Sequence, residues 1–146
     1  MYVSDANNDI WSSRHRTSPG DVVYCREAPF GMAAIVPAGF YPCLGQRIMV
    51  ARPNQDLVTT RFLWSALNSP FAFRQAKRVA VGATVKHLRV LDVEALEIPV
   101  PPLAFQKEFS RISDRLAALQ SSYSGSLDSA EEASSSLTQR AFRGEL

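Results

Sequence analysis

Short apolar runs bounded by glycine or proline occupy the first half of the chain. They cover residues 22–25, 32–36 and 47–51, and they are rich in β-branched and other apolar side chains. Pro29-Phe30-Gly31 predicts the turn between the first two runs, and Pro37-Ala38-Gly39 ends the second. We therefore expect a compact antiparallel or mixed sheet of short strands.

The period of the apolar positions then changes to that of helices. Ser69-Pro70 supplies a capping residue and a first-turn proline for a short helix that runs to about Arg78. A helix before it is predicted by residues that share one face, namely Phe62, Leu63, Ala66 and Leu67. Residues 92–96 predict one helical turn, and residues 97–100 predict a last strand that prolines end.

From Phe105 onward, apolar residues recur at alternating steps of four and three, the spacing of a coiled-coil seam. The seam consists of Phe105, Phe109, Ile112, Leu116, Leu119 and Tyr123. Its register continues through Ser126, Ala130, Ala133, Leu137 and Arg140, where Gly125 and a serine-rich stretch lower helix propensity. We expect a firm first half and a looser, partner-dependent second half. A helix from Phe105 to Phe142 would span ~57 Å, and so long an apolar edge is predicted to bind another helix.

These elements predict the α+β class. We expect a small mixed β-sheet domain with short helices over residues 1–102. One long C-terminal helix that forms a coiled coil follows over residues 103–146. The polar residues 1–18 show no clear period.

The charge of the chain is unevenly distributed. With 146 residues, 46% of them apolar, and a net charge of +2, the chain can form a domain of ordinary size. Between Ala28 and Leu91 the only acidic residue is Asp56, whereas the basic residues are Arg47, Arg52, Arg61, Arg74, Lys77, Arg78, Lys86 and Arg89. Clustered cations in a span with so few carboxylates are typical of phosphate binding. Separate solvated surface cations are the competing interpretation.

The cysteines and the start of the chain indicate the compartment. Cys25 and Cys43 sit on separate predicted strands without CxxC spacing, which favours buried free thiols. Residues 1–5 lack the basic start and apolar core of a signal peptide. No apolar run approaches the ~20 residues that cross a bilayer. We expect a soluble, cytoplasmic protein that does not bind membranes.

Motifs for catalysis are weak. Asn68-Ser69-Pro70-Phe71 is similar to the Asn-Pro-Pro-Phe type of motif with which amino-group methyltransferases hold a flipped adenine. However, a predicted helix precedes it and no glycine-rich cofactor loop does. Helix capping is the favoured interpretation.

Metal ligands and acid-base groups are also sparse. The possible metal ligands His15, Cys25, Cys43 and His87 match no zinc spacing. The carboxylates of residues 92, 94 and 97 fit the exposed side of a short helix better than a nuclease centre. No Ser-His-Asp arrangement is discernible. We therefore predict a protein that is not an enzyme and holds neither metal nor cofactor.

The best candidates for chemistry are donors suited to DNA. A glycine-led loop at 82–89 carries Lys86, His87 and Arg89, which can reach a phosphate or a base edge. Arg26 and Glu27 follow a predicted strand, where Arg can read guanine and Glu can accept from cytosine. Arg47 is a further candidate. Each has a structural alternative: local backbone bonding in the loop, a salt bridge for Arg26 and Glu27, and strand structure for Arg47.

Five elements occur in one order along the chain, and this order resembles the specificity (S) subunit of type I restriction-modification systems. The elements are Gly20-Asp21-Val22-Val23-Tyr24, Cys43-Leu44-Gly45-Gln46-Arg47, Leu67-Asn68-Ser69-Pro70, Gly82-Ala83-Thr84-Val85-Lys86-His87-Leu88, and Ile98-Pro99-Val100-Pro101-Pro102-Leu103 with the heptad run behind it. The resemblance covers about Pro19 to Leu146, and residues 139–146 are similar to the usual C-terminal end of that family.

The resemblance implies a non-catalytic subunit that recognises double-stranded DNA. Its globular part would read one half of a bipartite target. Its long helix would set the distance to a second reader and dock the methyltransferase (modification) subunit, with the restriction subunit as a further partner.

Two features set this chain apart from complete family members. They carry two recognition domains and two helices, so we expect this chain to pair with itself, helix antiparallel to helix, or with a second S fragment. They usually carry several dozen further residues before the GDVV element, so the domain is expected to be truncated at its front. The alternative is a coiled-coil interaction module or decayed fragment that binds partner subunits without reading DNA.

Overall fold

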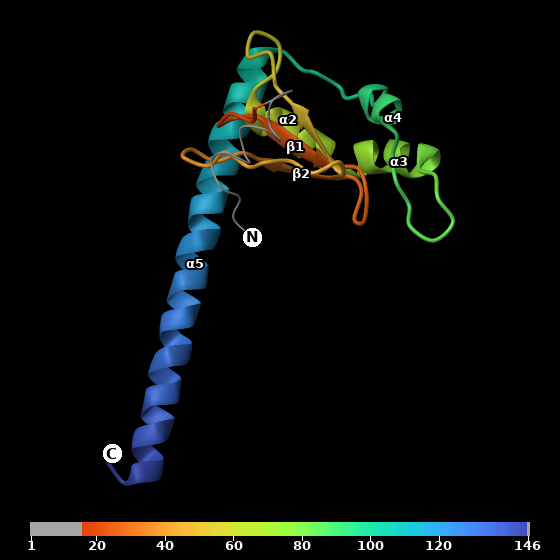
Figure 1. Cartoon of the computed structure of the whole chain (residues 1–146). Helices are drawn as coiled ribbons and strands as arrows, with labels where there is room; N and C mark the ends of the chain where they lie inside the picture. Colours follow the sequence, from red (N-terminus) through yellow and green to blue (C-terminus); the bar gives the residue numbers. More distant parts are fainter. Residues whose placement is uncertain (1–15, 146) are drawn as a thin grey trace. The chain divides into compact units, whose positions relative to one another are not determined.

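The computed structural model describes residues 16–145. Contacts divide the chain into two compact units, Met1–Lys107 and Glu108–Leu146. The expected α+β class is confirmed, because a small sheet with short helices precedes one long C-terminal helix (Figure 1). Residues 1–15, which include His15 and the start considered for a signal peptide, lie outside the described part of the chain.

Three short strands form one antiparallel sheet with β1 (Val22–Cys25) at its centre. β2 (Met32–Ile35) and β3 (Ile48–Ala51) pair with its two edges, and Val22 lies opposite Ile35 and Ala51. Each strand begins and ends within one residue of the run that predicted it. Cys43, expected on a strand, instead lies in the loop before β3, and both cysteines are free thiols.

The core lies on one face of the sheet because alternate residues of β1 are buried. Val22 and Tyr24 are 0% and 1% exposed. α2 (Thr60–Leu67) packs against β1 and β2, and α3 (Pro70–Val79) follows it (Figure 1). The buried cluster consists of Val22, Tyr24, Leu63, Leu67, Ala76 and Leu88.

The Gly-Asp pair before β1 has a structural role. Asp21 is 2% exposed, and its carboxylate accepts hydrogen bonds from Nε and Nη2 of Arg52 at 2.7 and 2.8 Å. It also accepts from the backbone N–H of Ser18 at 2.8 Å. A bidentate arginine compensates the burial of the carboxylate, and this hydrogen bond raises the pKa of Arg52. The ion pair of Asp21 and Arg52 thus joins the start of β1 to the end of β3.

The Asn-Ser-Pro segment joins two helices, as predicted. The Ser69 hydroxyl accepts from the Ala72 N–H at 3.2 Å and caps α3, with Pro70 as its first residue. Asn68 closes α2, and its side chain exchanges two 3.0 Å hydrogen bonds with the backbone of Ala33 in β2. These contacts give Asn68 and Ser69 structural roles, in agreement with the capping interpretation.

The prediction of a strand at residues 97–100 is wrong. Those residues have no regular secondary structure, because Pro99 lacks a donor and the backbone of Glu97 is bound elsewhere. The Gln75 side chain of α3 accepts from the Glu97 N–H at 3.0 Å and donates to its carbonyl at 2.7 Å. The predicted helical turn is α4 (Val90–Glu94), slightly earlier than expected.

The long helix α5 (Leu103–Arg143) begins within the first unit. Gln106 is 0% exposed. Its side chain accepts from the Thr59 N–H at 2.9 Å and donates to the carbonyls of Leu57 and Pro101 at 2.9 and 2.7 Å. The first turn of α5 is therefore fixed to the loop before α2. The helix is continuous to Arg143, and the expected difference in firmness between its halves stays a prediction.

Candidate nucleic-acid interface

Several segments meet where β1 ends and β2 and β3 begin. We call this region the sheet end and define it as residues 26–31, 45–48 and 81–89. Glu27 forms a backbone bridge with His87, and the Arg26 N–H donates to the Arg47 carbonyl at 2.8 Å. The turn after β1 and the loop after α3 lie at this same end in Figure 1. Folding thus gathers all six predicted DNA-contacting residues into one region.

Arg26 holds the sheet end together. Its Nη1 donates to the Leu88 carbonyl at 3.0 Å, and its Nη2 donates to the Gln46 carbonyl. Its own carbonyl accepts from the Leu88 N–H at 2.9 Å. Both terminal nitrogens of the Arg26 guanidinium are thereby bonded to backbone carbonyls, so Arg26 positions its neighbours. The salt bridge considered for it with Glu27 is replaced by these backbone contacts.

Two polar groups beneath this region are buried and have no hydrogen-bond partner among the described residues, the Tyr24 hydroxyl and Arg26 Nε. Burial is the main cause that raises the pKa of Tyr24, and the neighbouring Cys25 adds to it. The phenol is therefore neutral at physiological pH and supplies no negative charge to the sheet end.

An open groove separates two segments of the sheet end, and it is lined by residues 25–28 and 45–48. Arg47 and Glu27 face each other across it, with Nε and Oε2 3.5 Å apart and side chains 66% and 32% exposed. An exposed pair at this separation contributes little to stability. Both groups are therefore available to a ligand that enters the groove.

The glycine-led loop is closed by paired backbone bonds. Val81 and His87 exchange two N–H···O bonds of 2.9 Å, which leaves residues 83–86 exposed. Lys86 makes no hydrogen bond or ion pair with any residue of the described part. His87 is half-buried, and its Nδ1 lies 3.5 Å from the Val85 carbonyl. Within the described residues, the loop thus presents one cation without a side-chain partner beside a half-buried imidazole.

Gly82 is required for this loop, and Gly82→Ala should lower the free energy of unfolding by about 2 kcal/mol. Gly82 has φ 108°, and an added Cβ would lie 2.1 Å from the Val85 carbonyl oxygen. Urea denaturation followed by tryptophan fluorescence measures the loss. Gly45→Ala is the matched control, because nothing lies within 4 Å of its added Cβ. Equal stability of the two variants would contradict this account of the loop.

Arg89 is paired and begins α4. Its Nε and Nη2 donate to the Asp92 carboxylate at 2.8 and 2.9 Å, and its N–H donates at 3.1 Å. The side-chain hydrogen bond from Arg89 is the main cause that lowers the pKa of Asp92, and the same bond raises the pKa of Arg89. The charge that Arg89 could offer to DNA is therefore largely neutralised.

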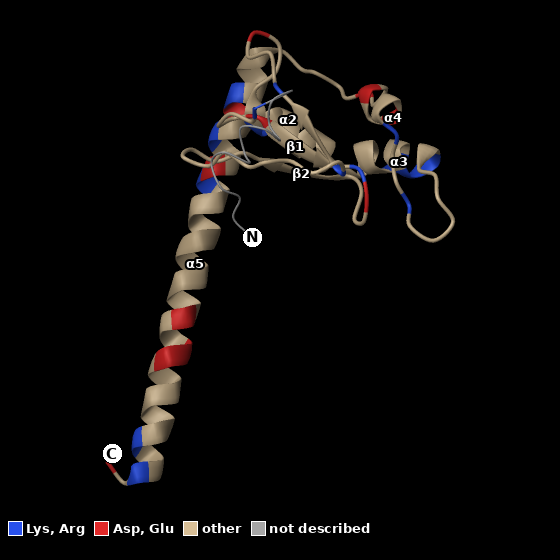
Figure 2. Ribbon diagram, in the orientation of Figure 1, with Lys and Arg blue, Asp and Glu red and all other residues tan. Residues whose placement is uncertain are grey.

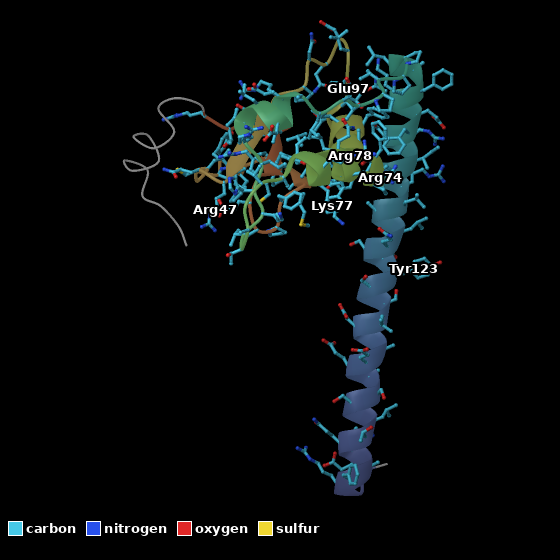
Figure 3. The ribbon with its side chains drawn as sticks, turned by 90° about the vertical axis from the view of Figure 1, so that its right-hand side faces the viewer. Arg47, Arg74, Lys77, Arg78, Glu97 and Tyr123 are labelled. Atoms are coloured by element: carbon cyan, nitrogen blue, oxygen red, sulfur yellow. The ribbon has the colours of Figure 1, made fainter. Side chains whose placement is uncertain are left out.

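The apolar seam forms a second candidate surface. Its six residues, Phe105, Phe109, Ile112, Leu116, Leu119 and Tyr123, are 37% to 75% exposed. Figure 3 shows Tyr123 projecting outward from α5. Leu137, further along the same register, is 52% exposed. An exposed apolar stripe of this kind is a candidate interaction surface.

Residues 16–145 contain no group of three or more His, Cys, Asp or Glu residues that could hold a metal ion. His15, one of the metal ligands considered, lies outside this range. None of the described helices has both the length and the apolar character that a membrane crossing requires.

The family model of the type I restriction modification DNA specificity domain matches residues 6–125. That match covers most of the chain, which therefore belongs to this family and has a specificity role in type I restriction-modification. The family is non-catalytic, and it implies DNA and the other subunits of the complex as partners. No curated protein shows a significant match to the chain.

Proposed function

We propose that this protein is the non-catalytic component that reads one half of a bipartite DNA target for a type I restriction-modification complex. The proposal is carried by the convergence of the predicted DNA-contacting residues at the sheet end. Glu27, Arg47 and His87 come from three separate segments and meet beside one groove. Residues on loops held by a rigid scaffold are typical of recognition sites.

The residues of the sheet end take different roles in this proposal. Arg47 and Glu27 read bases, since Arg donates to guanine and Glu accepts from the cytosine amino group in the major groove. Lys86 contacts phosphate. Arg26 and Arg89 keep loops in place through their backbone and carboxylate partners, and His87 closes the loop that carries Lys86. Discrimination is thereby assigned to Arg47 and Glu27, with Arg26 in support.

Arg47→Ala should relax specificity at one base position by about 10-fold to 100-fold, because a bidentate arginine contact discriminates by about 1–3 kcal/mol. The measurement is selection from a randomised duplex pool with the full chain. Arg115→Ala removes the same charge from α5 and should leave the selected site unchanged. The reading role fails if Arg47→Ala selects the same bases with the same preference.

The long helix is proposed to pair with a second copy of the chain, antiparallel. Its seam is bulky from Phe105 to Tyr123 and then becomes small at Ser126, Ala130 and Ala133. An antiparallel pair centred near Tyr123 places Ile112, Leu116 and Leu119 against the three small residues, which makes the distance between helix axes more even over that stretch. A parallel pair would be wide at one end and narrow at the other. Such a dimer would read a palindromic bipartite target.

The helix pair is also the proposed docking site for the methyltransferase subunit, with the restriction subunit as a further partner of the complex. Pairing with a second specificity fragment instead of a second copy would serve the same purpose. The division into a recognition domain over 1–102 and a docking helix over 103–146 belongs to this proposal, as does the cytoplasmic location.

A second candidate function is a protein-interaction module that binds partner subunits without reading DNA. It is favoured by the pairing of Arg47, Arg52 and Arg89 with carboxylates, which lowers the positive potential. Random duplex at low salt separates the two functions. Retention that moderate salt abolishes supports DNA reading, and no retention supports the interaction module.

A further inference from the structure

Folding divides the arginines and lysines of the acid-poor span into two groups. Three are paired with carboxylates: Arg47 with Glu27, Arg52 with Asp21 and Arg89 with Asp92. The guanidinium of Arg61 lies over the ring of Trp64, 5.2 Å from its centroid. The second group consists of Arg74, Lys77, Arg78 and Lys86. All four are exposed, and none of their side chains makes a hydrogen bond or ion pair with another residue between positions 16 and 145.

Three of these cations share one face of α3. Arg74, Lys77 and Arg78 stand at i, i+3 and i+4, so their side chains are neighbours. The opposite face carries Ala72 and Ala76, which are 0% exposed. Figure 3 shows the three side chains together on the globular unit. Like charges at this spacing destabilise an isolated helix, and a bound anion would relieve the repulsion.

The basic face adjoins the sheet end. Phe73 of α3 stacks on Phe30 of the turn after β1, with ring centroids 5.7 Å apart. The same ring would lie 2.8 Å from a Cβ added to Gly31, so helix and turn are in close contact. Lys77 lies one helical turn beyond Phe73, and the loop with Lys86 follows the end of α3. Figure 2 shows basic segments on α3 and on this loop.

Glu97, whose backbone is held beside α3, leaves these charges uncompensated. Gln75 holds the backbone of Glu97 beside α3 through two hydrogen bonds. Among the described residues, the Glu97 side chain forms no ion pair with Arg74, Lys77 or Arg78. Lys77 and Arg78 also lie in the last turn, where cations complement the helix dipole. Arg74 is too far from that end for the dipole to account for it.

We propose that α3 binds the phosphate backbone of the duplex whose bases the sheet end reads, with Arg74, Lys77, Arg78 and Lys86 contacting phosphates. This inference rests on the proposed function. Phosphate contacts need exposed, uncompensated cations and carry no sequence information themselves. Base contacts need a groove with mixed donors and acceptors, which the Arg47 and Glu27 pair supplies. In this proposal the basic face of α3 supplies affinity for DNA, and the groove of the sheet end supplies sequence discrimination.

The test is the salt dependence of binding by the full chain to a random duplex and to a selected one. Each phosphate contact contributes about 0.9 to the slope of log K against log salt. The triple variant R74A/K77A/R78A should therefore reduce the slope by about 2.7. Between 50 and 200 mM salt, the wild type should lose about 40-fold more affinity than the variant does. The base preference of the variant should be unchanged.

Two further variants make the outcome unambiguous. K107A/R115A/R143A removes the same charge from α5 and should keep the wild-type slope. R74K/R78K retains the charges of α3 and should also keep it, because a phosphate contact needs only a point charge. A triple variant that keeps the wild-type slope overturns this inference and leaves the proposed function standing. Failure of the wild type to retain any duplex at low salt overturns both.

Discussion

Replacing Leu116 and Leu119 with aspartate should convert the protein from a dimer into a monomer. Both leucines stand on the seam and are 56% and 54% exposed in the single chain. In an antiparallel pair each occurs twice, so the variant removes four leucines from the interface. At about 1.5 kcal/mol for each buried leucine, the loss is about 6 kcal/mol, or about 10⁴-fold in the dimer dissociation constant. Four introduced carboxylates add repulsion and desolvation to that figure.

Sedimentation velocity over a concentration series measures this change. Ala117→Asp with Ser121→Asp is the matched control, since it adds the same charge to the same turns but outside the seam. The control should sediment as the wild type does. A wild type that is monomeric at high micromolar concentration, or a seam variant that remains dimeric, would rule out pairing through this stripe.

The features that the sequence predicted well depend on residues close together in the chain. The long helix follows from one period along a single segment, and the Ser69 cap acts on an N–H three residues away. The strands were bounded by local glycine and proline signals. Such features require no knowledge of tertiary structure, so the pattern of residue types was sufficient to place them.

Two of the features that were missed depend on contacts between distant residues. The Arg26 guanidinium donates to carbonyls 20 and 62 positions away. These partners cannot be recognised from the sequence, so the residue type alone was compatible with a DNA contact and with a structural role. The expected strand at 97–100 was replaced by bonds from Gln75, which is 22 positions away. The pairing of Arg89 with Asp92 is local, and its i, i+3 spacing was the signal that could have revealed it. The i, i+3, i+4 spacing on α3 was likewise visible in the sequence.

Gln106 shows why a buried polar residue escapes sequence analysis. It lies next to Phe105 of the seam, where the heptad pattern predicts a solvated position. Two of its partners are backbone groups of Thr59 and Leu57, which come within reach only when the loop before α2 has folded, and the third is the carbonyl of Pro101, five residues before it. Backbone groups leave no trace in residue type, so no pattern of side chains could have indicated this contact.

Gln106→Ala should lower the free energy of unfolding by about 3–4 kcal/mol. The substitution removes three hydrogen bonds at a site that is 0% exposed. Each bond is worth about 1 kcal/mol, and backbone groups left buried without partners add to the loss. Tryptophan fluorescence during urea denaturation measures the change, because Trp64 packs against the core.

Gln139→Ala is the control for Gln106→Ala. Residue 139 is exposed on the same helix and lies outside the seam, so the variant makes the same change in side chain and helix propensity. It should alter stability by no more than about 0.5 kcal/mol. If both variants unfold at the same urea concentration, the buried amide does not fix the first turn of α5. If only Gln106→Ala is destabilised, the start of α5 is part of the globular unit. The proposed coiled coil then begins at a helical turn that the recognition domain fixes in place.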